Sequence, residues 1–504
     1  MGLPPLAPRI LSKRGQAAAD RRNGQLTGFT SLDFAVLALY LIGITAWGSW
    51  LGRGQSSGTD YFLAGRSLPW GAVMLSVVAT ETSTLTFLSI PGVAYRGSLV
   101  FLQLTFGYLA GRIAVALVFL PAYYRGDLST AYALLEERFG ACVRRATSAI
   151  FMVTRLLADS VRLFATAIPL ALITDWPYSA SIAAIGLLTV AYTYFGGIRA
   201  VVWVDAVQMS LYLLGAAVAM LAIHGAVPGG WASVLSSASQ EGKLDFLDLS
   251  WSLTAPYTLL AGLVGGAVFT MASHGTDQLI VQRVLTCRTE GDSRKAMIGS
   301  GVAVIGQFLL FLLVGIGLWS FYGGRAFDRS DEIFARFIVE ELPPGITGLL
   351  IACVFAAAMS SLSSSMNSLA SATAYDFWAP LARIKRDGRR ALRAGKAFTL
   401  AWAALLVGGA IAFIPLSRQT SAVEVALGVA AVVYGGLLGA FALGVLTRRP
   451  GKWAAILGIG TGIGSVIFLR NEVAWPWYVP VGATVTLVSG LVLGSAGKHF
   501  RQGR

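Results

Sequence analysis

The chain has 504 residues, of which 55% are hydrophobic and only 13% are charged, and its mean hydropathy is +0.67. This balance excludes an ordinary soluble enzyme and is typical of an integral membrane protein. The formal net charge of +14 could suggest a nucleic-acid partner, but the distribution of the basic residues along the chain argues against one.

Apolar windows long enough to cross a bilayer as helices recur along the whole sequence. We expect an all-α polytopic membrane protein with about 13 transmembrane helices, centred near residues 39, 79, 107, 158, 186, 213, 267, 310, 359, 405, 433, 460 and 487. Residues 1–28 are expected to form a disordered tail, and no signal-peptide cleavage site follows the first window. The two longest intervening segments, residues 225–251 and 323–344, are expected to be loops with short helices.

The basic residues lie mostly in alternate loops. If the C-terminus is cytoplasmic, these loops and the C-terminal tail hold about 24 of the 39 lysine and arginine residues, and the opposite loops hold roughly 7. This bias predicts a multi-pass protein of the cell inner (plasma) membrane, with its N-terminus outside. The basic residues of the tail at 1–28 do not fit this prediction. The sequence offers neither disulfides nor a transition-metal site, because it has three cysteines, three histidines and no ligand-spaced group of them.

Two of the windows are poor continuous helices. The second carries a polar run at residues 79–86 followed by Pro91-Gly92, and the seventh carries several glycines followed by residues 274–277 (HGTD). They lie five windows apart, which predicts two five-helix repeats of opposite topology, residues 69–224 and 254–446. A peripheral helix (29–52) precedes the repeats and two helices (452–495) follow them. Corresponding breaks in inverted repeats point to a midplane binding site, although membrane helices also tolerate glycine and proline without one.

A serine-rich run lies inside the ninth window, where apolar side chains are expected. Hydrocarbon disfavours unsatisfied polar groups, so such clusters face protein, water or an ion. The alternative is that the serines only let helices approach closely and hydrogen-bond across the interface. The run comprises Ser360, Ser361, Ser363, Ser364, Ser365 and Ser368.

Five local signatures occur in an order that resembles the sodium/solute symporter family, which includes the sodium/glucose cotransporters, proline permease and a bacterial sialic acid transporter. The resemblance covers residues 32–494 and implies the 5+5 inverted-repeat fold of the amino acid symporter LeuT, with alternating access. The signatures are residues 60–66 (DYFLAGR), 79–92 (ATETSTLTFLSIPG), 196–208 (GGIRAVVWVDAVQ), 275–283 (GTDQLIVQR) and 357–365 (AAMSSLSSS).

The resemblance implies Na⁺ as coupling ion. Sodium is a hard cation that takes oxygen ligands, which an unwound helix supplies as carbonyls and a serine-rich helix as hydroxyls. By resemblance, a first sodium ion is held by carbonyls of Ala79, Thr82 and Ala357 and by the hydroxyls of Ser360 and Ser361.

A second sodium ion is a further expectation. Ser363 and Ser364 share a helix face with Ser360, and Asp205 matches an aspartate that joins such serines in some family members. Alternatively, Asp205 is a solvated residue near the start of a helix. The number of coupling ions, one or two, stays open.

The fourth window carries Arg155, Asp159 and Arg162 on one helix face. Asp159 can pair with one arginine, so we expect about one unneutralised positive charge, which is costly at membrane depth and suits a carboxylate solute. The alternative is a structural ion-pair network. Arg162 is therefore a candidate solute-binding residue.

Other solute-binding candidates follow from their positions near the two breaks. Glu81 could tune cation attraction, meet a cationic group of the solute or carry a proton. Sugar transporters of the family have glutamine at the position of Thr86, which argues against a sugar. The set comprises Glu81, Ser83, Thr86, Gln103, Arg162, Thr270, Ser273, His274 and Glu424.

The function predicted from these features is sodium-coupled symport of a small polar organic solute, with an anionic solute favoured. The alternatives are a proton-coupled symporter of the same fold and a transporter-like sensor. We expect no enzyme activity, because no nucleophile–base or metal constellation is present, and no nucleic-acid partner. The oligomeric state is not predicted.

Overall fold

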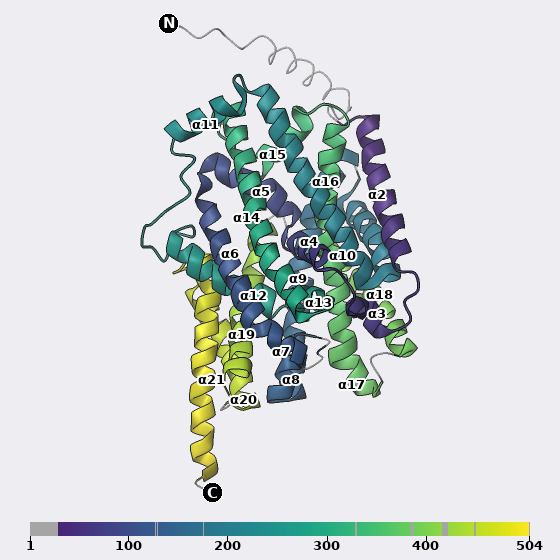
Figure 1. Ribbon diagram of the computed structural model, residues 1–504, viewed down its shortest axis with the longest axis vertical. Coiled ribbons are helices and arrows are strands. Elements are labelled where there is room, and N and C mark those ends of the chain that lie inside the picture. Colours follow the sequence, from purple (N-terminus) through teal and green to yellow (C-terminus); the bar gives the residue numbers. More distant parts are fainter. Residues whose placement is uncertain are drawn as a thin grey trace.

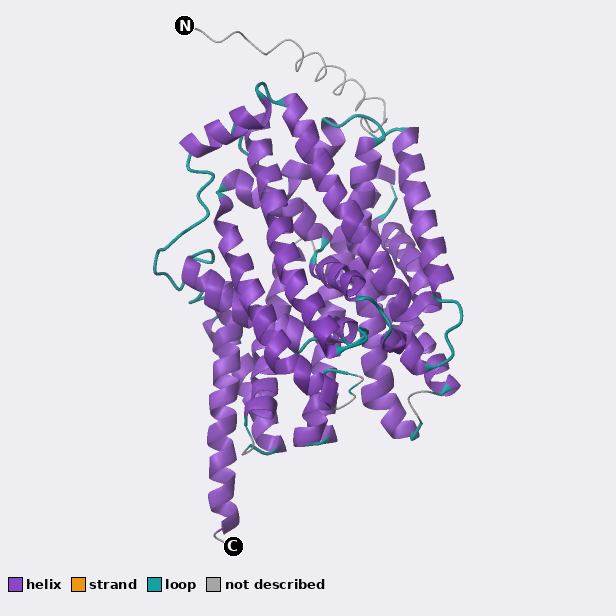
Figure 2. Ribbon diagram, viewed as in Figure 1, coloured by secondary structure: helices purple, strands orange, loops and turns teal. Residues whose placement is uncertain are grey.

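The computed structural model describes residues 29–502, apart from residues 126–127, 129, 175, 328–329, 385–387, 416–421 and 448–449. The predicted tail at 1–28 lies outside the described residues. Within the described part the chain is helical and contains no strand (Figure 2). This is the expected class, because in lipid a helix satisfies its own backbone hydrogen bonds.

The long helices account for the bundle and are drawn in Figure 1. They are α2 (Ser31–Leu51), α4 (Trp70–Glu81), α5 (Thr84–Arg96), α6 (Leu102–Ala114), α9 (Ala141–Thr174), α10 (Tyr178–Ala226), α12 (Gly266–Gly275), α14 (Glu290–Phe321), α16 (Ile346–Ala372), α18 (Arg389–Phe413), α19 (Ala422–Leu446), α20 (Lys452–Leu469) and α21 (Tyr478–Gln502). The shorter helices are α3 (Gly58–Leu63), α7 (Leu120–Arg125), α8 (Ala133–Phe139), α11 (Gly230–Gln240), α13 (Gln278–Val284), α15 (Asp331–Glu340) and α17 (Ala379–Ala382). Short 3₁₀ or π segments are η1 (Ala64–Arg66), η2 (Leu99–Phe101), η3 (Val115–Phe119), η4 (Ala261–Gly265), η5 (Thr373–Trp378) and η7 (Trp475–Trp477).

Every predicted window centre falls inside one of these helices. Among the described residues, eight helices are long and apolar enough to cross a membrane, and the bent pair of α4 and α5 makes a ninth. The difference from thirteen arises partly because α10 contains two predicted centres in one helix of 49 residues. The two predicted loop segments contain α11 and α15, as expected.

The two halves of α10 join at Gly197, where the backbone turns sharply. Gly197 has φ of +53°, a left-handed conformation that favours glycine, and a Cβ there would lie 2.5 Å from the carbonyl oxygen of Tyr61. Gln55 Nε2 donates to the Gly196 carbonyl at 2.5 Å. The GGIR sequence is therefore the point where one predicted span ends and the next begins.

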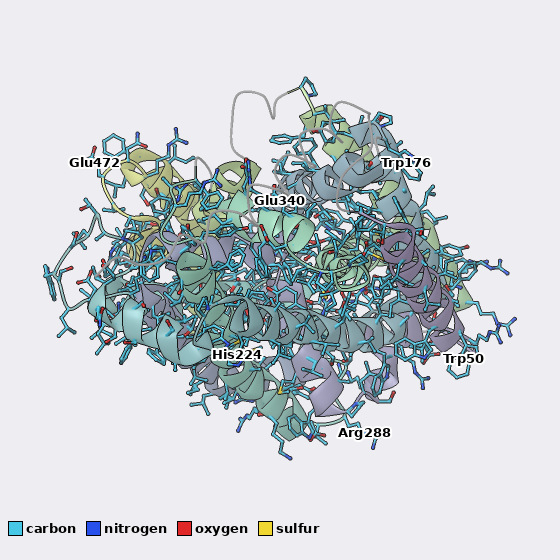
Figure 3. All side chains as sticks on the ribbon, turned by 90° about the horizontal axis from the view of Figure 1, so that it is seen from above. Trp50, Trp176, His224, Arg288, Glu340 and Glu472 are labelled. Carbon is cyan, nitrogen blue, oxygen red and sulfur yellow. The ribbon has the colours of Figure 1, made fainter. Side chains whose placement is uncertain are left out.

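The serine-rich helix α16 is the most buried of the candidate spans. In the span that contains α16, 83% of the most apolar 18-residue window is buried. The corresponding share in the other seven candidate spans is 17–61%. It packs against α2, α4, α9, α10 and α18. The first and last helices flank the bundle: α2 lies at one side and α20 and α21 at the other (Figure 1). Seen from above, Trp50 at the end of α2 and Glu472 after α20 lie on opposite sides (Figure 3).

The segments that precede α4 and follow α13 are joined by backbone hydrogen bonding. Leu68 N–H donates to the Thr286 carbonyl at 3.1 Å, and Leu68 and Cys287 form an isolated parallel bridge. Gln282 Nε2 also donates to the Phe62 carbonyl at 2.8 Å. These contacts connect the same end of both predicted broken spans.

Candidate functional site

The first break in the bundle lies at Thr82 and Ser83, between α4 and α5. Both residues have extended backbone angles, and the two helices are bent by 65°. Ser83 and Thr86 cap α5 reciprocally: each backbone N–H donates to the other's hydroxyl at 3.4 Å. This capping box satisfies the helix start within the membrane region.

The capping box also explains why carbonyls are free at the break. In a continuous helix, the carbonyls of Ala79 and Thr82 would accept from the N–H groups of Ser83 and Thr86. Here those two N–H groups donate to side-chain hydroxyls instead. The carbonyls of Ala79 and Thr82 are thereby released from these helical bonds, and a cation can use them.

Helix α16 faces this break. On one side of the break, Thr80 Oγ1 lies 3.4 Å from Ser364 Oγ, and on the other, Thr84 Oγ1 donates to the Val354 carbonyl at 3.2 Å. The part of α16 between these two contacts contains Ala357, Ser360 and Ser361. The structure thus brings together the elements that carry all five expected ligands of the first sodium ion.

The two serine hydroxyls are differently engaged. Ser360 Oγ donates to Oδ1 of Asp205 at 2.7 Å, while Ser361 Oγ donates to the Ala357 carbonyl at 3.2 Å. Ser360 is fully buried and Ser361 is partly exposed. Neutral oxygens with one carboxylate nearby fit a hard monovalent cation.

The residues expected at a second sodium ion are also gathered. Asp205 is fully buried, which rules out a solvated position, and its Oδ2 accepts from Ser76 Oγ at 2.6 Å and from Arg283 Nη2 at 3.1 Å. Ser363 and Ser364 donate to the Ser360 carbonyl at 3.0 and 2.5 Å. The Arg283 guanidinium therefore lies among these groups as the cationic partner of Asp205, and a second sodium ion here stays a prediction.

The expected unneutralised charge on the fourth predicted span is not observed. Arg155 forms an ion pair with Asp277 and donates to Tyr434 Oη at 2.6 Å, while Arg162 Nη1 lies 3.3 Å from Oδ1 of Asp159. The prediction of one unneutralised charge was wrong because Asp277, between α12 and α13, supplies a second carboxylate. Arg155 and Arg162 thus each have an acidic partner.

A small cavity lies beside the first break, between α5, α9 and α16. Its volume is about 20 Å³, room for about one water molecule. Arg162, whose side chain is 22% exposed, lies in its wall. The lining residues are Ser83, Thr84, Asp159, Arg162, Leu163, Thr166, Ala358, Ser361 and Leu362.

The second break lies at Thr276 and Asp277, between α12 and α13. The Asp277 carboxylate accepts from Leu279 N–H at 2.9 Å and so caps α13. Gln278 accepts from Ala131 N–H at 2.7 Å. Asp277 and Gln278 thus brace the broken helix.

A central cluster of charged and polar groups connects the two breaks. Arg112 on α6 forms an ion pair with Glu81, and its Nη2 also donates to Nε2 of His274 at 3.0 Å. His274 Nε2 must then accept, so the ring is neutral and its proton lies on Nδ1, 2.9 Å from Ser273 Oγ. Thr270 is buried one turn before His274. Three of the predicted solute-binding residues, Thr270, Ser273 and His274, thus lie on α12, and Glu81 joins them from α4 through Arg112.

Of the remaining predicted candidates, Gln103 is placed differently. Gln103 lies nine residues before Arg112 on α6, where its Nε2 donates to the Tyr257 carbonyl at 3.1 Å and its Oε1 accepts from Asp248 N–H at 3.2 Å. The side chain of Glu424 lies outside the described residues.

Sequence reasoning missed two buried residues of the site. Arg112 is a lone charge inside an otherwise apolar window, a signal that could have identified it. Gln307 on α14 exchanges hydrogen bonds with Thr82 Oγ1 at 2.8 and 3.1 Å, and nothing in its local sequence indicates this contact.

Two broken helices that meet at a buried, oxygen-rich site within a bundle of apolar helices define a membrane-embedded secondary transporter. The chain belongs to the sodium:solute symporter family, whose model matches residues 61–462. As a member of this family it is a sodium-coupled symporter, and Na⁺ is its coupling ion.

Several transporters are similar in sequence. The human sodium/iodide cotransporter is 31% identical over 87% of this chain and 70% of its own length. The sodium/sialic acid symporter NanT of Aliivibrio fischeri (strain ATCC 700601 / ES114) is 28% identical over 92% of both chains. The human sodium-coupled monocarboxylate transporter 1 is 27% identical over 86% of this chain and 72% of its own length.

Solved structures agree on the fold. A Na⁺-coupled sialic acid symporter in a substrate-bound outward-open state superposes with a TM-score of 0.84 at 26% identity, covering 93% of this chain and 98% of that one. A nucleobase–cation symport family transporter in a closed conformation has a TM-score of 0.55 at 14% identity, covering 89% of this chain and 96% of that one. The fold is therefore the LeuT-type fold expected from the sequence.

Proposed function

We propose that this symporter couples sodium entry to uptake of a small organic anion by alternating access. The observation that supports this proposal most is the break at Thr82 and Ser83, where the capping box releases two carbonyls opposite the hydroxyls of Ser360 and Ser361. Ala79, Thr82, Ala357, Ser360 and Ser361 hold the first sodium ion. The two inverted repeats are residues 69–224 and 254–446.

The sodium gradient supplies the free energy. Each positive charge moving down about 100 mV releases about 2.3 kcal/mol, enough for nearly fifty-fold accumulation of solute. The ion stabilises one arrangement of the broken span, so ion and solute binding reinforce each other. The first site binds one sodium ion. A second, held by Asp205, Ser360, Ser363 and Ser364, is added only if it displaces Arg283 from Asp205 and Ser364.

The solute is placed between the two breaks. Arg162 contributes a guanidinium at the wall of the small cavity, and Ser83 and Ser361 contribute hydroxyls there. A cavity of about 20 Å³ is too small for an organic acid, so solute entry requires α5 to move relative to α9 and α16. An anionic solute is also consistent with the names of the relatives, which mention iodide, sialic acid and monocarboxylate.

Uptake assays in proteoliposomes test this proposal. Solute accumulation is expected with an inward sodium gradient and is expected to collapse in potassium or choline. A proton-coupled symporter would instead respond to a pH gradient with sodium absent, and a sensor would bind solute without accumulating it. Uptake indifferent to sodium, lithium and proton gradients alike contradicts symport. We propose no enzyme activity for this chain.

We further propose an inner-membrane topology with the N-terminus outside and the C-terminus cytoplasmic. The start of α2 and the end of α21 lie at opposite ends of the bundle (Figure 1), as this topology requires. The basic residues near the start of α9 then lie on the cytoplasmic side.

Labelling of Cys142 tests the topology. Cys142 is exposed at the start of α9, whereas Cys287 and Cys353 are buried. Burial also raises the pKa of the Cys287 thiol to about 12, which suppresses its reactive thiolate. A membrane-impermeant maleimide is expected to label inside-out but not right-side-out vesicles, and Cys142→Ser is expected to remove the signal. Labelling of right-side-out vesicles that Cys142→Ser abolishes would reverse the topology.

A further inference from the structure

Arg112, on α6, links the two broken spans of the protein. Its side chain is fully buried, and its Nη2 contacts Glu81, the last residue of α4, and His274, in the last turn of α12. The aliphatic stem passes Gly301 on α14, where a Cβ would lie 3.2 Å from Cδ of Arg112. Helix packing on three sides thus holds this guanidinium in one position.

Two of the three Arg112 nitrogens have no hydrogen-bond partner. Nε and Nη1 are buried and unpartnered, and so is the nearby Thr270 Oγ1. Thr270 packs against α6 next to Arg112. A Cβ built on Gly111, the residue before Arg112, would lie 2.8 Å from the Cβ of Thr270. Buried guanidinium donors without acceptors are costly, so this arrangement suits a ligand that brings oxygen acceptors.

Other buried arginines in the described residues show that such donors need not be left free. Arg283 uses all three nitrogens, on Ser76, on the Leu279 carbonyl and on Asp205. Arg144 likewise bonds through Nε, Nη1 and Nη2. These two guanidiniums serve structural ion pairs, whereas the Arg112 guanidinium retains binding capacity.

The charges around Arg112 explain how the binding of an anion would depend on sodium. Arg112 and Glu81 carry opposite charges and His274 is neutral, so the cluster has no net charge by itself. A solute carboxylate alone would leave one uncompensated negative charge in a low-dielectric site. Glu81 directly precedes Thr82, a proposed sodium ligand, so a sodium ion bound there supplies the balancing positive charge.

We propose that Arg112 binds the carboxylate of the transported solute and that Glu81 makes this binding depend on sodium. The inference rests on the proposed function and extends it with a specific anchor. The Glu81 side chain is 20% exposed, so it marks the side from which the carboxylate reaches Arg112. Thr270 supplies a neutral hydroxyl to the same ligand.

The test uses the purified full-length protein and thermal stabilisation, which reports binding to the folded state. The probes are pyruvate, nicotinate and N-acetylneuraminate, with lactamide and nicotinamide as uncharged controls, in sodium chloride or choline chloride. For the native protein we expect sodium to stabilise by itself, and at least one carboxylate to stabilise further only when sodium is present. The amides are expected to have no effect.

Three variants separate the roles of the two residues. Arg112→Gln is expected to retain stabilisation by sodium but to bind the carboxylate roughly 10- to 100-fold more weakly. Glu81→Gln is expected to bind the carboxylate in choline chloride, because Arg112 alone then balances its charge. If Arg112→Gln does not fold, the double variant Glu81→Gln/Arg112→Gln removes both charges and is expected to fold without binding carboxylate.

The matched control is Arg336→Gln, which breaks an exposed ion pair with Glu332 on α15. It is expected to leave both responses unchanged. Three results overturn the inference: stabilisation by none of the carboxylates, equal stabilisation by amides, or undiminished carboxylate binding in the Arg112 variants. A native protein that does not respond to sodium contradicts the proposed function itself, so the two failures are distinguishable.

Discussion

Replacing Ser360 and Ser361 together with alanine is expected to abolish sodium-stimulated uptake. The double variant removes both hydroxyl ligands of the first sodium ion and leaves only backbone carbonyls. Each contact between a hydroxyl and a charged group is worth about 1.5–3 kcal/mol, so the apparent sodium affinity should fall at least about 100-fold. Sodium-dependent uptake in proteoliposomes, measured over a range of sodium concentrations, gives the result.

Ser368→Ala is the matched control for this experiment. Ser368 lies two turns further along α16, and its hydroxyl donates to the Ser365 carbonyl of its own helix at 3.2 Å. This variant is expected to keep native sodium dependence, which shows that losing a serine from α16 is not harmful by itself. Unchanged sodium dependence in the Ser360/Ser361 double variant would remove the basis for the first sodium site.

Replacing Asp205 with alanine is expected to cause the largest loss of stability. Asp205 and Arg283 are both fully buried, and the change leaves the guanidinium without its carboxylate. Breaking a buried ion pair from one side costs about 3–5 kcal/mol, which for a chain of 504 residues corresponds to a decrease of roughly 3–5 °C in Tm. Thermal unfolding of the detergent-purified protein measures it.

The double variant Asp205→Leu/Arg283→Met is the control for charge. It removes both charges with little change in side-chain volume, so it is expected to regain much of the lost stability. A double variant no more stable than Asp205→Ala contradicts the ion-pair explanation. Sodium titration of uptake by the native protein measures the number of coupling ions. One ion predicts a Hill coefficient near 1, and two predict a value approaching 2.

Hydropathy was sufficient to predict most of the fold. All predicted window centres fall within helices because a chain in lipid must satisfy its backbone bonds internally, so long apolar stretches become helices. The breaks were also predictable, since polar residues, glycine and proline interrupt two windows at matching positions. The sequence did not reveal how closely the two spans join at Gly197, because the sharp turn there depends on packing against residues 55–61.

The site was predicted less completely, since its contacts join distant parts of the chain. Ser360 and Ser361 were found because several hydroxyls in one apolar window are conspicuous. The partner of Arg155 was missed because Asp277 lies 122 residues away in the sequence. Arg112 was missed although a lone arginine in an apolar window is a signal, because the sequence does not show that it contacts Glu81 and His274. Ser83 and Thr86 are predicted to bind solute, and this stays a prediction; the structure shows that they cap α5.

The hydrogen bond from Leu68 to Thr286 and the contact from Gln282 to Phe62 have a mechanical consequence. They join α4 and α13, the two half-helices at one end of the molecule, into one unit. Opening at that end must displace both half-helices in concert, and the Arg155–Asp277 ion pair, which ties α13 to α9, must then separate. We therefore expect the two half-helices to move together, against the ion pairs that tie α13 to α9 and, through Arg283 and Asp205, to α10.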